Sequence, residues 1–161
     1  IFTNILNTID RIIKFICILL FTSLLVIISL QIIARYIFQT PYIWTEEGAT
    51  LIFIWLCFLG GTIVYRKNAH ISIDFFINML SPTTKKIVTS IILLLITVFF
   101  IFLALITIPL IERGTLLRVV TMPWLNWGYV YLSVQLSSII MCLYSIENLF
   151  NVWKLTKIQT S

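Results

Sequence analysis

Charged residues are scarce in this chain of 161 residues. Asp, Glu, Lys and Arg make up 11% of it, whereas an average soluble domain carries about a quarter. Hydrophobic residues account for 60%, and the mean hydropathy is +1.08. A chain of this length cannot hide so many apolar side chains in a water-soluble core. The composition therefore excludes a soluble globular enzyme and a disordered chain, and it predicts a membrane protein.

Histidine and closely spaced cysteine are also lacking. His70 is the only histidine, and Cys17, Cys57 and Cys142 lie far apart, each within an apolar run. A four-helix membrane cytochrome needs pairs of axial histidines, and a dithiol redox centre needs neighbouring thiols. The sequence thus argues against a membrane redox enzyme. We predict no catalytic residue, no cofactor and no metal site.

Four long uncharged or nearly uncharged runs divide the chain. Each contains at least 18 residues, and about 20 apolar residues in a helix cross a bilayer. The pattern predicts an all-α integral membrane protein with a single domain over residues 1–161. The predicted transmembrane helices cover residues of about 13–36, 46–66, 84–111 and 123–148.

The eleven basic residues are distributed unequally between the connections. Eight of them fall on the side of the two termini and three on the other side. Because Lys and Arg concentrate on the cytoplasmic side of membrane proteins, both termini are predicted to be cytoplasmic. Basic residues spread this thinly form no continuous basic surface, so we predict no nucleic-acid partner.

The connection after the second predicted helix contains a short apolar segment, about 69–80. Twelve residues are too few to cross a bilayer, and the segment suits a short interfacial helix. Lys85 and Lys86 follow it at the expected level of the lipid headgroups, where they are candidates for contact with anionic lipids.

The centres of the predicted spans contain no charged residue, although pumps and ion-coupled transporters usually carry one there. Small residues such as Gly60 and Gly61 are present instead, and they allow helices to approach closely. One group of small residues can pack the helices of this chain into a bundle, and another can contact a second subunit. Trp55, in the middle of a span, is predicted to pack against another helix.

The second span is preceded by Trp44-Thr45-Glu46-Glu47. Thr45 is predicted to be the N-cap of the helix, with both acidic residues in its first turn, near the positive end of the helix dipole. The alternative is that Glu46 or Glu47 contacts a partner at the outer surface.

An ordered set of short motifs from residue 44 to residue 82 resembles the small membrane subunit of tripartite ATP-independent periplasmic (TRAP) transporters. The set consists of Trp–Thr–Glu–Glu, a tryptophan, a Gly–Gly pair, a basic pair and His–x–x–x–Asp. The sequence departs from the family pattern at Gly61, where alanine is frequent. The positions that match the family motif are Trp44, Glu46, Glu47, Trp55, Gly60, Gly61, Arg66, His70 and Asp74.

The resemblance implies a role in a transporter of the bacterial inner membrane. A large subunit with many spans would carry the substrate and sodium sites, and a periplasmic binding protein would deliver an organic acid such as a C4-dicarboxylate or a sialic acid. The small subunit would be a non-catalytic scaffold, and the motif residues would serve assembly or contact with the partner. The alternative is an autonomous transporter or channel formed by several copies of this chain.

Overall fold

Long α-helices dominate the computed structural model, which describes residues 2–40, 42–68 and 82–159. They are α1 (Phe2–Tyr36), α2 (Ile43–Asn68), α4 (Pro82–Leu116) and α5 (Gly128–Gln159). Each contains a stretch long and apolar enough to cross a membrane. The backbone N–H and C=O groups of a helix bond to one another. A helix can therefore cross the hydrocarbon core, where no water is available to bond them. The predicted all-α fold with four membrane-spanning helices is therefore confirmed.

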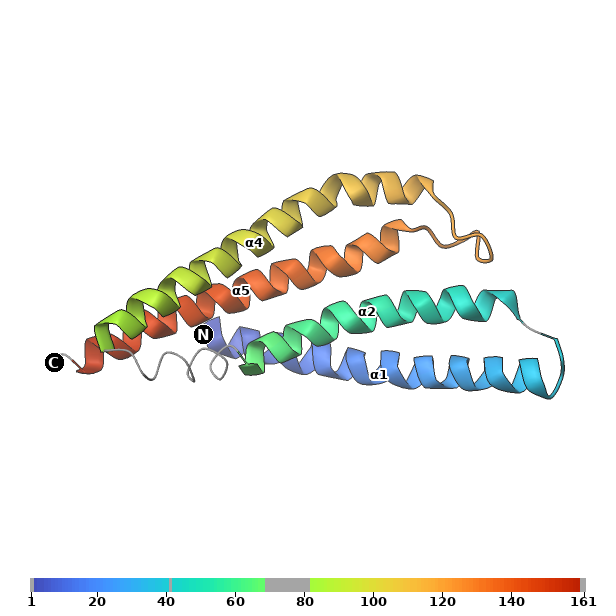
Figure 1. Ribbon diagram of the computed structural model, residues 1–161, viewed down its shortest axis with the longest axis horizontal. Coiled ribbons are helices and arrows are strands. Elements are labelled where there is room, and N and C mark those ends of the chain that lie inside the picture. Colours follow the sequence, from blue (N-terminus) through green and yellow to red (C-terminus); the bar gives the residue numbers. More distant parts are fainter. Residues whose placement is uncertain (1, 41, 69–81, 160–161) are drawn as a thin grey trace.

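The helices lie side by side in one layer, in the order α4, α5, α2, α1 (Figure 1). Helices α1 and α2 form one antiparallel hairpin and α4 and α5 form another, and the two hairpins meet where α2 packs on α5. The helices therefore form an open layer, with α1 and α4 at its edges.

The layer has two ends with different contents (Figure 1). The terminus end contains the start of α1, the end of α2, the start of α4 and the end of α5. The loop end contains residues 37–40 and 42, between α1 and α2, and residues 117–127, between α4 and α5. Both ends of the described chain thus lie on the same side of the four spans.

Helices α1, α4 and α5 differ by five residues or more from the spans predicted for them: α4 ends at Leu116 and not near 111, and α5 ends at Gln159 and not near 148. Helix α1 begins at Phe2, ahead of the expected start near 13, and its early residues Leu6 and Ile13 are buried. Helix α5 begins at Gly128 and not near 123, because residues 117–127 form a compact turn. In that turn the backbone N–H of Val119 donates to Leu125 O, and that of Trp127 donates to Leu117 O, both at 3.0 Å.

Helix α4 bends near the loop end, where Pro109 lies inside it (Figure 1). Proline cannot donate a backbone hydrogen bond, and its ring displaces the carbonyl one turn earlier. Beyond the bend, α4 no longer diverges from α5 and runs toward the 117–127 turn at the loop end (Figure 1).

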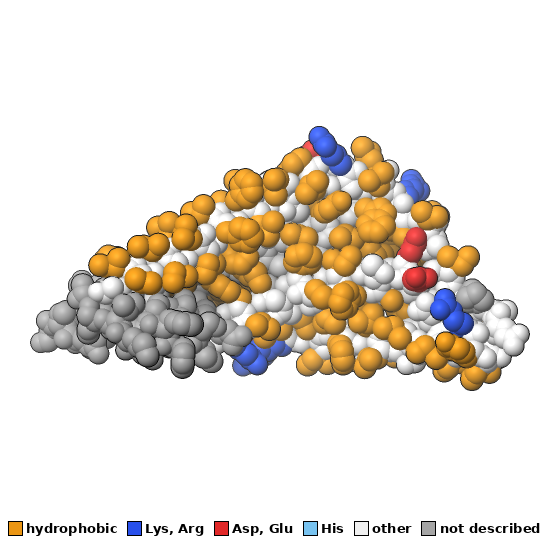
Figure 2. Space-filling view, in the orientation of Figure 1, with side chains coloured by type: hydrophobic (Ala, Val, Ile, Leu, Met, Phe, Trp, Pro, Cys, Tyr) orange, Lys and Arg blue, Asp and Glu red, His pale blue; other side chains and the backbone are white. Residues whose placement is uncertain are grey.

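The broad face of the layer is apolar (Figure 2). Charged side chains appear on it mainly toward the loop end and near the terminus end, with hydrophobic side chains between them. Only 11% of the most apolar stretch of α1, α2 and α4 is buried within the chain, and 28% of that of α5. Exposing so many apolar side chains to water is unfavourable, so this surface must lie against lipid or another protein.

Candidate functional site

Buried hydroxyl groups line the contact between α4 and α5. The hydroxyls of Thr97 and Ser145 lie 2.7 Å apart, and Ser145 Oγ donates to Leu93 O at 3.1 Å. On the α5 side Ser133, Ser137 and Ser145 are almost completely inaccessible. Small hydroxyl side chains let helix backbones approach closely and add interhelical hydrogen bonds. The contacts of Ser145 with Thr97 and Leu93 therefore connect the two helices of this hairpin.

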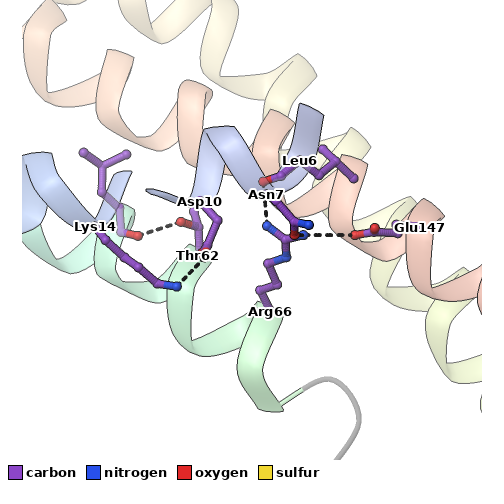
Figure 3. A network of polar contacts seen from close by, with 8 residues as sticks. Leu6, Asn7, Asp10, Lys14, Thr62, Arg66 and Glu147 are labelled. Atoms are coloured by element: carbon purple, nitrogen blue, oxygen red, sulfur yellow. Dashed lines mark hydrogen bonds and ion pairs between the residues drawn. The ribbon is translucent and has the colours of Figure 1, made fainter. Parts of the chain in front are cut away.

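Arg66 joins three helices at the terminus end (Figure 3). From α2 its guanidinium donates to Leu6 O at 2.5 Å and to Asn7 Oδ1 at 2.6 Å, both on α1. The same group lies 3.7 Å from Glu147 Oε2 on α5 and 4.7 Å from the centre of the Tyr144 ring. The planar guanidinium can make these contacts at once because its donors point in several directions.

The Arg66 contacts are shielded from solvent. The Arg66 side chain is 17% exposed and that of Glu147 is 10% exposed, while Tyr144 is fully buried. Asp10 and Lys14 form a second ion pair one helical turn apart on α1. We call Arg66 and its contacts on α1 and α5 the terminus junction, because they connect α1 and α5 through α2.

At the loop end the 117–127 turn rests on the start of α2. Glu47 Oε2 accepts hydrogen bonds from the backbone N–H of Thr121, at 2.9 Å, and from the Thr121 hydroxyl. An ideal Cβ on Gly48 would lie 3.2 Å from Met122 Cε, so the glycine admits the methionine side chain. These contacts, the loop junction, connect the two hairpins at the end opposite Arg66.

A cleft of about 350 Å³ opens beside the loop junction. Its lining combines carboxylates with apolar and aromatic groups, namely Ile43, Glu46, Glu47, Thr50, Leu51, Val119 and Trp127. The structure thus brings Glu46 and Glu47 together at the same opening, with Glu47 fixed by Thr121 and Glu46 exposed.

The predicted N-cap at Thr45 is wrong. Helix α2 begins at Ile43, two residues earlier, and the Thr45 hydroxyl donates to Tyr42 O at 2.6 Å. An N-cap side chain accepts a hydrogen bond from the first turn, whereas this one donates to a carbonyl. Glu46 nevertheless lies in the first helical turn, as the sequence indicated, whereas Glu47 lies just beyond it.

Gly60 and Gly61 face different surroundings, although they are adjacent on α2. An ideal Cβ on Gly61 would lie 3.2 Å from Met141 Cε of α5, whereas one on Gly60 would meet nothing within 4 Å. Gly61 therefore serves packing within the chain, and Gly60 faces outward. Trp55 is half-buried on the same helix, and Trp44 is largely exposed at its start.

The structure does not describe the side chains of four candidate residues. His70 and Asp74 fall outside the described residues, as does the predicted interfacial segment 69–80, and the side chains of Lys85 and Lys86 are likewise not described. Within the described ranges, no group of three or more His, Cys, Asp or Glu side chains could hold a metal ion together.

The partners of Arg66 and Glu47 were not found by sequence reasoning. Asn7, Tyr144, Glu147 and Thr121 lie between 59 and 81 positions away from them, and no local motif links such distant residues. One signal was available. Glu147 ends a long uncharged run at the side of the membrane where Arg66 ends another, so an ion pair between them was possible.

Comparison with known proteins identifies the family. Residues 24–155 match the family described as tripartite ATP-independent periplasmic transporters, DctQ component. Because this match covers most of the chain, the protein belongs to that family, and the resemblance noted in the sequence is confirmed. It is a small TRAP transporter subunit, and its apolar helices place it in the bacterial inner membrane as a multi-pass protein.

Individual relatives carry names from the same transport systems. The sialic acid TRAP transporter small permease protein SiaQ of Vibrio cholerae is 27% identical over 158 residues, covering 94% of this chain and 86% of the relative. The sialic acid TRAP transporter permease protein SiaT of Haemophilus influenzae is 35% identical over 85 residues, 52% of this chain. That match spans only 14% of the length of SiaT. The C4-dicarboxylate TRAP transporter small permease protein DctQ of V. cholerae is 28% identical over 57 residues, 35% of this chain and 25% of the relative.

Proposed function

We propose that this chain is the non-catalytic scaffold of a TRAP transporter. In this proposal it braces a large membrane subunit, and that subunit moves an organic acid with sodium after a periplasmic binding protein delivers it. The observation that carries the proposal is the open layer of helices. Helices side by side in one layer enclose no central pathway for a solute, but they offer a broad apolar wall to a neighbouring membrane protein.

The polar junctions at the two ends support a static role. The terminus junction connects α1, α2 and α5, and the loop junction connects α2 to the turn between α4 and α5. Connected at both ends, the two hairpins resist sliding past each other. A rigid wall of this kind would keep a moving domain of the large subunit from tilting the whole complex and losing substrate binding energy.

The match to SiaT supports a large membrane subunit as the partner. A segment similar to half of this chain forms a small part of one much longer permease polypeptide. Covalent linkage in a relative is expected where two parts act as one assembly. The outward-facing Gly60 adds a position at which a helix of another subunit can approach α2 closely.

The names of the relatives support the class of substrate. Two of the relatives are named as parts of sialic acid TRAP transporters, and another as part of a C4-dicarboxylate TRAP transporter. We therefore propose a carboxylate-bearing organic acid of one of these two kinds as the solute carried by the complex.

Reconstitution tests the scaffold role. We expect liposomes that contain this chain and the large subunit, with binding protein outside, to accumulate the acid when a sodium gradient is applied. Liposomes that lack this chain should show at least a tenfold lower initial rate, because the unbraced large subunit tilts. Uptake by this chain alone would contradict the proposal and would favour an autonomous transporter formed by several copies.

We further propose that the terminus end faces the cytoplasm and the loop end the periplasm. The support is the excess of Lys and Arg in the connections at the terminus end. Because the chain has four spans, both termini lie on one side of the membrane. Finding which compartment each end of the layer faces therefore decides the orientation.

Thiol labelling is the measurement for orientation. In a background with Cys17, Cys57 and Cys142 replaced by serine, we expect Val120→Cys to react with a membrane-impermeant maleimide on intact cells, since Val120 is 85% exposed at the loop end. Lys67→Cys should react only after the membrane is opened. The reverse pattern would require the opposite orientation.

A further inference from the structure

We propose that the cleft beside Glu46 and Glu47 holds the side chain of a lysine or arginine from the large membrane subunit. This inference rests on the scaffold function proposed above and adds the chemistry of one contact. The occupant follows from the charge of the cleft, the character of its walls, its size and its depth in the membrane.

The charge of the cleft calls for a cation. Asp10 and Glu147 each lie within ion-pair distance of a basic side chain, but across the described residues neither Glu46 nor Glu47 does. Two neighbouring carboxylates at one opening repel each other, and a cation between them relieves that repulsion. The chain has a net charge of +5, yet its own described basic groups do not neutralise this pair.

The walls of the cleft suit a long basic side chain. Ile43, Leu51 and Val119 supply apolar surface for the methylene groups of lysine or arginine, which commonly lie along such surface. Trp127 supplies an aromatic ring, a favoured neighbour of ammonium and guanidinium groups. Glu47 is already held by Thr121, so little freedom is lost when a cation binds there.

The size of the cleft limits the occupant to one side chain. A volume of about 350 Å³ admits an arginine or a lysine with some water, whereas a helix with its side chains is about 10 Å wide and does not fit. The partner therefore inserts a side chain from a helix or helix end that lies beside α2.

The depth of the cleft favours a membrane-embedded partner over a soluble one. From residue 48 to residue 65, α2 has 18 uncharged residues, about 27 Å of helix, which is close to the thickness of the hydrocarbon core. Glu47 therefore lies at the edge of that core, and Leu51 lies one turn deeper. A subunit that itself spans the membrane reaches this level, whereas a protein docking from the periplasm meets the headgroups first.

The test uses the complex of this chain with the large subunit, purified through a tag on this chain. We expect Glu46→Gln with Glu47→Gln to weaken the binding of the large subunit about tenfold in detergent, equivalent to about 1.4 kcal/mol. Glu46→Gln alone should weaken it about threefold. Its side chain makes no hydrogen bond or ion pair with the described residues, so this variant leaves the loop junction intact. The matched control is Glu112→Gln, an exposed acid of α4 outside the cleft, which should bind as the wild type does.

Crosslinking identifies the occupant. With a photoreactive benzoylphenylalanine in place of Thr50, which lines the cleft and is exposed, we expect the crosslink to form on the large subunit beside a lysine or arginine. Replacing that basic residue by glutamate should reduce binding, and Glu46→Lys in this chain should restore it.

The outcomes separate the two proposals. If the wild-type chain does not retain the large subunit at all, both the scaffold role and this inference fail. If it does, but the double variant binds equally well, only the inference fails. Crosslinks to the binding protein, to a second copy of this chain or to lipid alone would also overturn it.

Discussion

Replacing Arg66 by alanine is expected to lower the unfolding free energy of the isolated chain by about 2–4 kcal/mol. The change removes the hydrogen bonds to Leu6 and Asn7 and leaves the Glu147 side chain, only 10% exposed, without its cation. A buried charge that loses its partner typically costs about 3–5 kcal/mol, and the residual exposure of this pair reduces that figure. At about 2–4 °C per kcal/mol, the melting temperature in detergent should fall by roughly 4–16 °C.

Two variants show whether the loss arises from the terminus junction. Glu147→Gln should make a subsequent Arg66→Ala less costly, because the uncompensated carboxylate is then absent, and the two effects should not add. Arg113→Ala is the control, since Arg113 is exposed at the end of α4. A melting temperature for Arg66→Ala within 1 or 2 °C of that of Arg113→Ala, roughly the shift of an isolated surface charge, would contradict the role given to Arg66.

A single methyl group at Gly114 is expected to disrupt the hairpin of α4 and α5. An ideal Cβ there would lie 2.8 Å from the backbone nitrogen of Gly128 and 2.8 Å from Cδ2 of Tyr131. Alanine is intrinsically better than glycine in a helix by about 1 kcal/mol, but overpacking typically costs about 1–3 kcal/mol. Because a backbone atom is among the contacts and cannot rotate away, we expect Gly114→Ala to destabilise the chain by about 1–2 kcal/mol net.

Gly60→Ala is the matched control for that prediction. Both substitutions add the same methyl group within a helix, but the one at Gly60 meets nothing within 4 Å. In the isolated chain it should leave the unfolding free energy unchanged or raise it by up to about 1 kcal/mol through helix propensity, and the melting temperature should follow. Thermal unfolding of the two variants in the same detergent measures the difference. A Gly114→Ala variant as stable as Gly60→Ala would mean that the hairpin is not tightly packed there.

The boundaries of the helices could be predicted only where charge marks them. Arg35 and Tyr36 lie at the end of α1, and Arg66 lies in the last turn of α2, as the edges of the uncharged runs indicated. The start of α5 was missed by about five residues. Residues 119–127 carry no charge that would mark them off from the following span, and their turn is defined by backbone hydrogen bonds within 117–127 and by the contact of Thr121 with Glu47.

The candidate residues were found by motif and not by contact. Glu46, Glu47 and Arg66 were singled out because they match a family pattern, and the structure then placed the two acids at a cleft and the arginine between three helices. Gly60 and Gly61 were equivalent in the sequence. Only the position of α5, with Met141 beside Gly61, separates an inward glycine from an outward one.

Amino-acid composition and the spacing of charges determined by themselves that this protein crosses a membrane four times, since the cost of placing charge in lipid acts on each span separately. The tertiary structure decided which faces of the spans meet. In lipid an apolar side chain is equally tolerated on every side of a helix, so hydrophobicity does not indicate the packed face. Close fit at small residues and a few polar contacts select that face, and these depend on residues far apart in the chain.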